Sequence, residues 1–234
     1  TANSSGAAGG IIVEGGTPII RNTVINGNTA NSGAGICSYG GNPQFLNSTV
    51  INNRASSIGG GVFVNGGGAS FSSVIFVGNR SQSEGGAIHA SSGSNITITK
   101  SNFLLNQSST NGGALYLNFN SRANISNSTF ESNSSNGQGS AVYSASGAQP
   151  LLRYCNVTGN PRSVVNEDNS LVLGAQNNWW GQTAGPYQLT QNPNGKGDSV
   201  GLFVNVLPFL VIPDTNAPPP LVRNLRVSSS DYNS

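Results

Sequence analysis

The sequence predicts an all-β fold: a single-stranded, right-handed parallel β-helix, or solenoid, of about seven coils of 25–27 residues with an irregular C-terminal cap. Three features of the 234 residues lead to this prediction. A glycine-rich phrase recurs, an asparagine recurs in step with it, and apolar residues alternate in short runs between them. A propeller blade would need a longer period, of about 40 residues.

The glycine-rich phrase and the asparagine are two independent markers of one repeat. The phrase advances in steps of 25, 26, 26, 27 and 27 residues, and its copies begin at Ala8, Gly33, Gly59, Gly85, Gly112 and Gly139. The asparagine advances almost identically, at Asn28, Asn53, Asn79, Asn106, Asn133 and Asn160. Two markers that drift together define a structural repeat whose copies stack on their neighbours.

Three short strands per repeat are expected, because alternate residues of a strand share one face. The fourth residue of each glycine phrase is apolar in every copy and marks the first inward column: Ile11, Ile36, Val62, Ile88, Leu115 and Val142. Eight residues before the asparagine lies a second column: Ile20, Phe45, Phe71, Ile98, Ile125 and Leu152. Three residues before it lies a third: Ile25, Val50, Phe76, Phe103, Phe130 and Val157.

Each recurring residue type has a physical role in such a coil. Glycine supplies unusual backbone angles where the wall turns and side chains would collide with the next coil. A stacked asparagine can hydrogen-bond its copies above and below. Charged residues are only 8% of the chain, as expected where stacking would place like charges about 5 Å apart.

The C-terminal third departs from the repeat. We expect the β-helix over residues 1–181, closing strands of a cap over 182–212, and a proline-rich linker and tail over 213–234 that could lead into another module. Trp179 and Trp180 lie where the open end of the core needs a cover. Stacking on a sugar ring is the alternative role for these two tryptophans.

The paired phrases resemble the repeats of the polymorphic outer membrane proteins and related bacterial β-helix surface proteins. Here they stand as GGAI at 85–88 with FLLN at 103–106, and as GGAL at 112–115 with FESN at 130–133. The likeness covers roughly residues 8–160, and NNWWG at 177–181 is similar to the closing segment of many secreted β-helix proteins. The resemblance implies surface display, adhesion or a structural role, usually without catalysis. No β-barrel domain follows in this chain, and Ile25 and Val50 stand where the family prefers Phe.

The fifth residue of each glycine phrase lies between inward positions and should face outward. In the last four copies this column is Phe63, His89, Tyr116 and Tyr143. Either the chain covers it, by a loop or by the C-terminal segment around Leu202–Val211, or it is a contact face for a partner subunit or a glycan. We treat it as the candidate contact face.

Catalytic and metal-binding residues are hard to assemble from this sequence. Polysaccharide-cleaving members of the fold use clustered carboxylates with a nearby base, whereas the acids here fall at different phases and only Glu167 and Asp168 are adjacent. Arg21 and Arg153 share a phase but lie five coils apart. His89 is the only histidine. We therefore expect no cofactor, no metal and no enzyme activity, with a polysaccharide lyase or epimerase as the alternative.

Composition favours a secreted or cell-surface protein. The chain has two cysteines and no methionine, which suits an oxidising setting. A net charge of +2 offers nucleic acid no basic surface, and no apolar run approaches the roughly 20 residues of a membrane span.

Three roles are open from the sequence: an adhesin-like or rod-like surface module, a subunit of an extracellular filament, and a polysaccharide-active enzyme. The expected partners are protein subunits, cell-surface or glycan ligands, or further copies in a fibre. Nine N-x-S/T sequences occur, about as many as composition predicts, and could be glycosylated: Asn3, Asn47, Asn79, Asn95, Asn106, Asn124, Asn127, Asn133 and Asn156.

Overall fold

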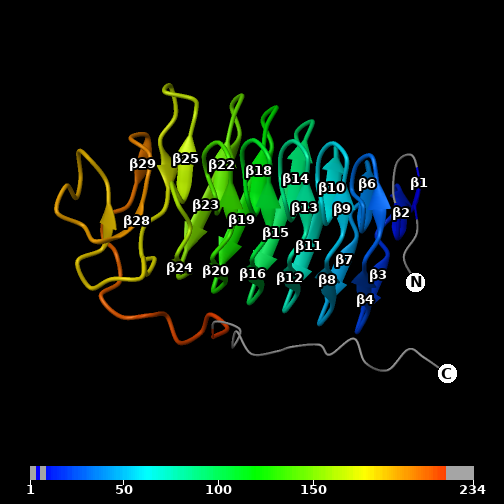
Figure 1. The fold of residues 1–234 in the computed structure, drawn as a ribbon, viewed down its shortest axis with the longest axis horizontal. Coiled ribbons are helices and arrows are strands. Elements are labelled where there is room, and N and C mark those ends of the chain that lie inside the picture. The colour runs from blue at the N-terminus through cyan, green and yellow to red at the C-terminus, as the bar shows by residue number, and fades with distance from the viewer. Residues whose placement is uncertain (1–3, 6–8, 220–234) are drawn as a thin grey trace.

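The computed structural model describes residues 4–5 and 9–219 and confirms the parallel β-helix (Figure 1). Within these residues every regular element is a strand, and none is a helix. The coils stack along one axis, and each strand pairs in parallel with its copies in the neighbouring coils. Sheet B contains one strand from each coil and has seven strands, in agreement with the predicted number of coils.

Four parallel sheets, named A to D, form the walls of the solenoid. Sheet B contains β2 (Ile11–Glu14), β6 (Ile36–Tyr39), β10 (Val62–Asn65), β14 (Ile88–Ser91), β18 (Leu115–Leu117), β22 (Val142–Ser144) and β25 (Val164–Asn166). Sheet C contains β3 (Ile19–Arg21), β7 (Gln44–Leu46), β11 (Gly68–Ser72), β15 (Asn95–Thr99), β19 (Arg122–Ser126), β23 (Gln149–Arg153), β26 (Leu173–Gly174) and β29 (Val204–Asn205). Sheet D contains β4 (Val24–Asn26), β8 (Thr49–Ile51), β12 (Ile75–Val77), β16 (Asn102–Leu104), β20 (Thr129–Glu131) and β24 (Asn156–Thr158).

Sheet A is a fourth wall that the repeat pattern did not predict. Its strands are β1 (Ser4–Ser5), β5 (Thr29–Ala30), β9 (Arg54–Ala55), β13 (Arg80–Ser81), β17 (Gln107–Ser108) and β21 (Ser134–Ser135). Each strand has only two residues, too few to show an alternation of apolar and polar side chains. It follows directly after the recurring asparagine, where the sequence suggested a turn.

The three inward columns of the prediction form the core. Their residues pair in register from coil to coil, so like side chains stack on like. Phe76 and Phe103 are parallel with ring centroids 4.6 Å apart, and Phe103 and Phe130 repeat the stack at 4.7 Å. All three rings are fully buried. This in-register packing follows from a repeat length that varies by only one or two residues.

The recurring asparagines form a continuous hydrogen-bonded ladder inside the corner between sheets D and A. Each side-chain amide donates to the carboxamide oxygen of its copy in the next coil at 2.9–3.0 Å. At the C-terminal end, Asp198 replaces the next copy: its carboxylate accepts from the Asn160 backbone and side chain and from the Gly159 N–H. Burial raises the pKa of Asp198, and these hydrogen bonds oppose the rise in part.

The C-terminal segment closes the stack. Strands β27 (Pro186–Tyr187) and β28 (Gly197–Ser199) form a small separate sheet, and β29 adds a final strand to sheet C. Trp180 is fully buried in the core cluster, while Trp179 is half-buried and bridges to Asn156 as an extension of sheet D. Trp180 therefore covers the end of the core and is inaccessible to a sugar in the folded protein.

Residues 213–219, predicted as part of a proline-rich linker, lie against the solenoid. They run back beneath the coils, along the outer surface of sheet D (Figure 1). The Asp214 backbone exchanges two hydrogen bonds with the Asn156 side chain, at 2.8 and 3.0 Å, and the Asp214 carboxylate accepts one from Asn127. Thr129 donates to the Pro218 carbonyl, and Ala217 is buried. This stretch is a strap on the solenoid; the rest of the predicted tail, residues 220–234, lies outside the described part.

Candidate functional site

The candidate contact face is an in-register column on the outer side of sheet B, as predicted. Phe63 pairs with His89, His89 with Tyr116, and Tyr116 with Tyr143. The ring centroids are 5.5, 4.9 and 5.5 Å apart along the column. The two tyrosine rings are stacked within 8° of parallel, whereas Phe63 and His89 meet edge to face. We call these four residues the aromatic ladder.

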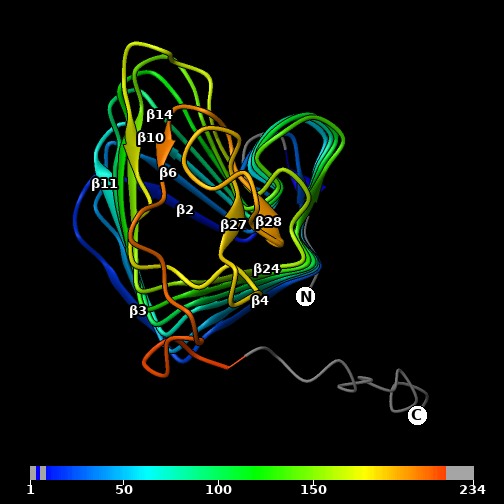
Figure 2. The same cartoon turned by 90° about the vertical axis from the view of Figure 1, so that its left-hand side faces the viewer.

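The aromatic ladder is buried, which corrects its assignment as a contact face. Phe63, His89, Tyr116 and Tyr143 are only 8, 3, 9 and 6% exposed. The part of the structure that covers the ladder is neither the C-terminal segment around Leu202–Val211 nor a second molecule. It is the chain's own lobe, the stack of segments that connect sheet A to sheet B: residues 29–35, 54–60, 80–86, 107–113 and 134–140 (Figure 2).

Glycines bring the lobe onto the aromatic ladder. In the four phrases that precede the ladder residues, the first glycine has a positive φ, +68° at Gly85 and +70° at Gly112, and lies against the ladder residue of its own coil. A Cβ at Gly85 would lie 2.9 Å from the His89 Cβ, and one at Gly112 would lie 2.7 Å from the Tyr116 Cβ. Only glycine allows both the backbone angle and this close approach. The recurring Gly-Gly-Ala phrase therefore encodes the closed lobe.

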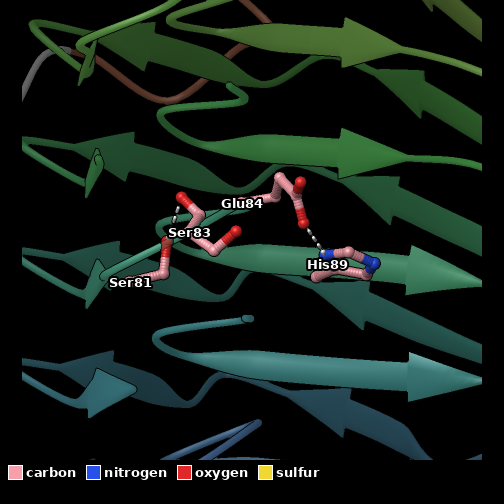
Figure 3. A network of polar contacts seen from close by, with 4 residues as sticks. All are labelled: Ser81, Ser83, Glu84 and His89. Atoms are coloured by element: carbon pink, nitrogen blue, oxygen red, sulfur yellow. Dashed lines mark hydrogen bonds and ion pairs between the residues drawn. The ribbon is translucent and has the colours of Figure 1, made fainter. Parts of the chain in front are cut away.

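His89 and Glu84 make the one acid–base side-chain contact within 4 Å among the described residues (Figure 3). Glu84 comes from the lobe, next to Ser83 and Ser81, and its Oε2 lies 3.9 Å from His89 Nδ1, beyond hydrogen-bond distance. Burial lowers the pKa of His89 to about 4, and the backbone carbonyl of Glu84 opposes this only in part. The imidazole is therefore neutral at physiological pH.

The pKa values of the two tyrosines are shifted in the opposite direction, upward. Burial raises the pKa of Tyr116 to about 12, with a smaller contribution from the Glu84 carboxylate. Burial also raises the pKa of Tyr143, and Glu167 adds to the rise. Both phenols thus keep their protons at neutral pH. The pKa values of the imidazole and of both phenols thus lie far from 7, and the lobe covers all three groups. Such groups are suited to packing rather than to proton transfer.

Acid should weaken the fold through His89. The folded-state pKa, about 4, is depressed, so the unfolded chain, with a histidine pKa of about 6.5, takes up the proton first. The contribution of the neutral imidazole is complete above about pH 6.5 and is lost as the pH falls toward 4, by at most about 3 kcal/mol. Denaturant unfolding at pH 7 and pH 4.5 measures this loss. His89→Phe keeps an aromatic ring and should lose less stability over this interval; an unchanged pH dependence would contradict the assignment.

The remaining candidate residues stay apart. Glu167 is exposed after β25, and Asp168 turns away to accept hydrogen bonds from Ser170, which lower its pKa. Arg21 and Arg153 are exposed at opposite ends of one sheet C column. Among the described residues no three histidine, cysteine, aspartate or glutamate side chains come close enough to hold a metal ion.

The candidate glycosylation sites differ in how deeply their asparagines are buried. Asn79, Asn106 and Asn133 belong to the asparagine ladder, are at most 1% exposed and use Nδ2 in hydrogen bonds, so the folded protein cannot carry glycans there. Asn156 is buried and Asn127 is half-buried, and both amides donate to Asp214. The exposed candidates are Asn47, Asn95 and Asn124. Asn3 lies outside the described residues.

One surface feature was missed from the sequence. Arg54 and Arg80 lie side by side on sheet A, paired in register in adjacent coils. Each directly follows the recurring asparagine, as Asn53-Arg54 and Asn79-Arg80. That shared phase could have identified the pair, although nothing in the sequence placed a strand there.

No helix in the described part of the chain is long and apolar enough to cross a membrane.

Comparison with known proteins agrees with this geometry. No curated relative and no solved structure matches the chain. A family model described as the right-handed β-helix region matches residues 2–179, about three quarters of the sequence. The chain therefore belongs to the right-handed β-helix family.

Proposed function

We propose that this protein is a non-catalytic extracellular module, adhesin-like or rod-like, that acts through its repetitive exterior. The observation that carries the proposal is the distribution of side chains around the coil. Most large apolar residues stack inside the coil or beneath the lobe, with exposed exceptions such as Val24 and Phe119, while the outer columns are mainly small and polar. One such column of sheet C runs through Ser70, Thr97 and Asn124 at the strand spacing of about 4.8 Å.

Two further points support an extracellular, surface role. The GGA(I/L/V) and FxxN phrases resemble those of the polymorphic outer membrane proteins, for which surface display is the expected role. Both cysteines, Cys37 and Cys155, are buried free thiols, so no exposed cysteine among the described residues would react in an oxidising environment.

Removal of whole coils tests whether function is spread over the exterior. Deletion of residues 86–112 joins Gly85 to Gly113, and deletion of 113–139 joins Gly112 to Ser140, each in phase with the repeat. Both variants should fold, because each coil contacts only its neighbours. We expect both to keep most of the wild-type retention on immobilised pectin, alginate or glycosaminoglycan, and to release no unsaturated or reducing products.

The two alternatives predict different results in the same experiment. A polysaccharide-active enzyme would release products, and deletion of the coil that holds its site would abolish the release. A filament subunit would assemble into fibres visible by electron microscopy and would be retained poorly as a monomer. Either result, or failure of the wild-type protein to bind any surface, would overturn the proposal.

A further inference from the structure

Two arginines on sheet A occupy directly paired strand positions on the described exterior. Arg54 and Arg80 are register partners in β9 and β13, so their backbones are one strand spacing apart, about 4.8 Å. Each arginine is exposed while the following residue, Ala55 or Ser81, is buried. Both guanidinium side chains therefore leave the same face of the solenoid.

No acid among the described residues pairs with either arginine. Like charges on directly paired strand positions are destabilising, and the only acid–base side-chain contact within the described residues is the one between His89 and Glu84. Glu84, the acid nearest to Arg80 in sequence, extends toward His89 (Figure 3). The fold thus holds two adjacent cations on its surface in a chain that has few charges.

The surroundings of the pair are hollowed and polar. On one side lies a depression of about 450 Å³, which Asn52, Gly78 and Leu105 line together with the two arginines. On the other side lies one of about 280 Å³, lined by Ser81, Gln82, Gln107 and Ser109 and again by both arginines. The guanidinium groups stand between two hollows with hydroxyl and amide groups in reach of a ligand.

We propose that Arg54 and Arg80 form a binding site for a tetrahedral oxyanion ester, carried as a sulfate group on a glycan chain. A guanidinium presents a planar fork of donors. A carboxylate, with two oxygens, can satisfy one such fork, whereas a sulfate ester has three free oxygens and can accept from two stacked forks at once. The hydroxyl and amide groups of the flanking hollows suit the hydroxyls of the sugar rings.

This inference deepens the proposed function and rests on it, because it names the chemistry of one partner of the exterior. Nucleic acid, the other common polyanion, fits less well. No aromatic side chain lines either hollow to stack a base.

The test compares variants of equal net charge on immobilised dextran sulfate. R54Q/R80Q removes the pair, while R21Q/R153Q removes two exposed arginines from opposite ends of a sheet C column. We expect R54Q/R80Q to lose affinity about tenfold or more, which corresponds to one lost charge-assisted contact, and R21Q/R153Q to lose about twofold. R54K/R80K keeps the charge without the fork and should fall between them.

Further polymers identify the source of the oxyanion, and a thermal measurement controls for folding. Polygalacturonate carries carboxylates, polyphosphate carries phosphates, single-stranded DNA carries phosphates with bases, and dextran is neutral. We expect dextran sulfate to bind most tightly. It should also raise the melting temperature of the wild-type protein but not that of R54Q/R80Q.

Three results would overturn the inference. Equal losses of affinity in R54Q/R80Q and R21Q/R153Q would show that binding depends only on net charge. Tighter binding of polygalacturonate, polyphosphate or DNA would refute a sulfated glycan. Retention of the wild-type protein on other polysaccharides without affinity for dextran sulfate would refute this site and leave the proposed function standing.

Discussion

Asn106→Ala is expected to destabilise the protein strongly, because it truncates a member of the asparagine ladder in the middle of the stack. Asn106 is fully buried, and its side chain makes four hydrogen bonds. Oδ1 accepts from the Asn79 backbone N–H at 3.1 Å and from Asn79 Nδ2 at 3.0 Å. Nδ2 donates to the Phe76 carbonyl and to Asn133 Oδ1, both at 3.0 Å. Alanine removes all four and leaves buried groups in the two neighbouring coils short of partners.

The expected loss in the free energy of unfolding is about 4 kcal/mol, since each buried polar group left without its hydrogen bond costs about 1–3 kcal/mol. Denaturant unfolding followed by circular dichroism measures it. Asn124→Ala is the matched control, because Asn124 is an exposed asparagine on β19 in the middle of the stack, and its truncation should change stability by about 0.5 kcal/mol or less. A loss below about 1 kcal/mol for Asn106→Ala would show that the asparagine ladder does not hold the coils together.

Gly85→Ala should also be strongly destabilising, because it forces the lobe away from the aromatic ladder. At φ +68° an alanine is strained, and its Cβ would lie 2.5 Å from the Ile88 carbonyl oxygen and 2.9 Å from the His89 Cβ. The first neighbour is backbone of β14 and cannot rotate away. We expect a loss of about 3 kcal/mol from the backbone strain and the displaced lobe together.

Gly93→Ala separates the two causes. Gly93 has nearly the same backbone angle, φ +70°, but an added Cβ there would meet nothing within 4 Å. Its cost should be the conformational one alone, about 1 kcal/mol. The difference between the two alanine variants in thermal unfolding reports the contact between lobe and ladder. Equal losses of stability in the two variants would mean that the lobe can move away at no cost and that it does not pack tightly on the aromatic ladder.

The sequence by itself determined the coil. Its period, inward columns, phenylalanine stacks and in-register asparagines follow from the repeat, because a parallel stack with a nearly constant period places each residue against its own copy. The position of Trp180 at the end of the core could also be read from the point where the repeat stops.

Only the tertiary structure decided what lies over the coil. Alternation placed Phe63, His89, Tyr116 and Tyr143 on the outside of sheet B, but alternation says only which side of a strand a residue takes. The lobe that buries them depends on glycine backbone angles and on two-residue strands too short to show a period. The strap at residues 213–219 likewise depends on contacts such as Asp214 with Asn156, which are distant in sequence. The same short strands bring Arg54 and Arg80 together. Their shared position after the recurring asparagine indicates the pairing, but only the structure shows that they lie on strands.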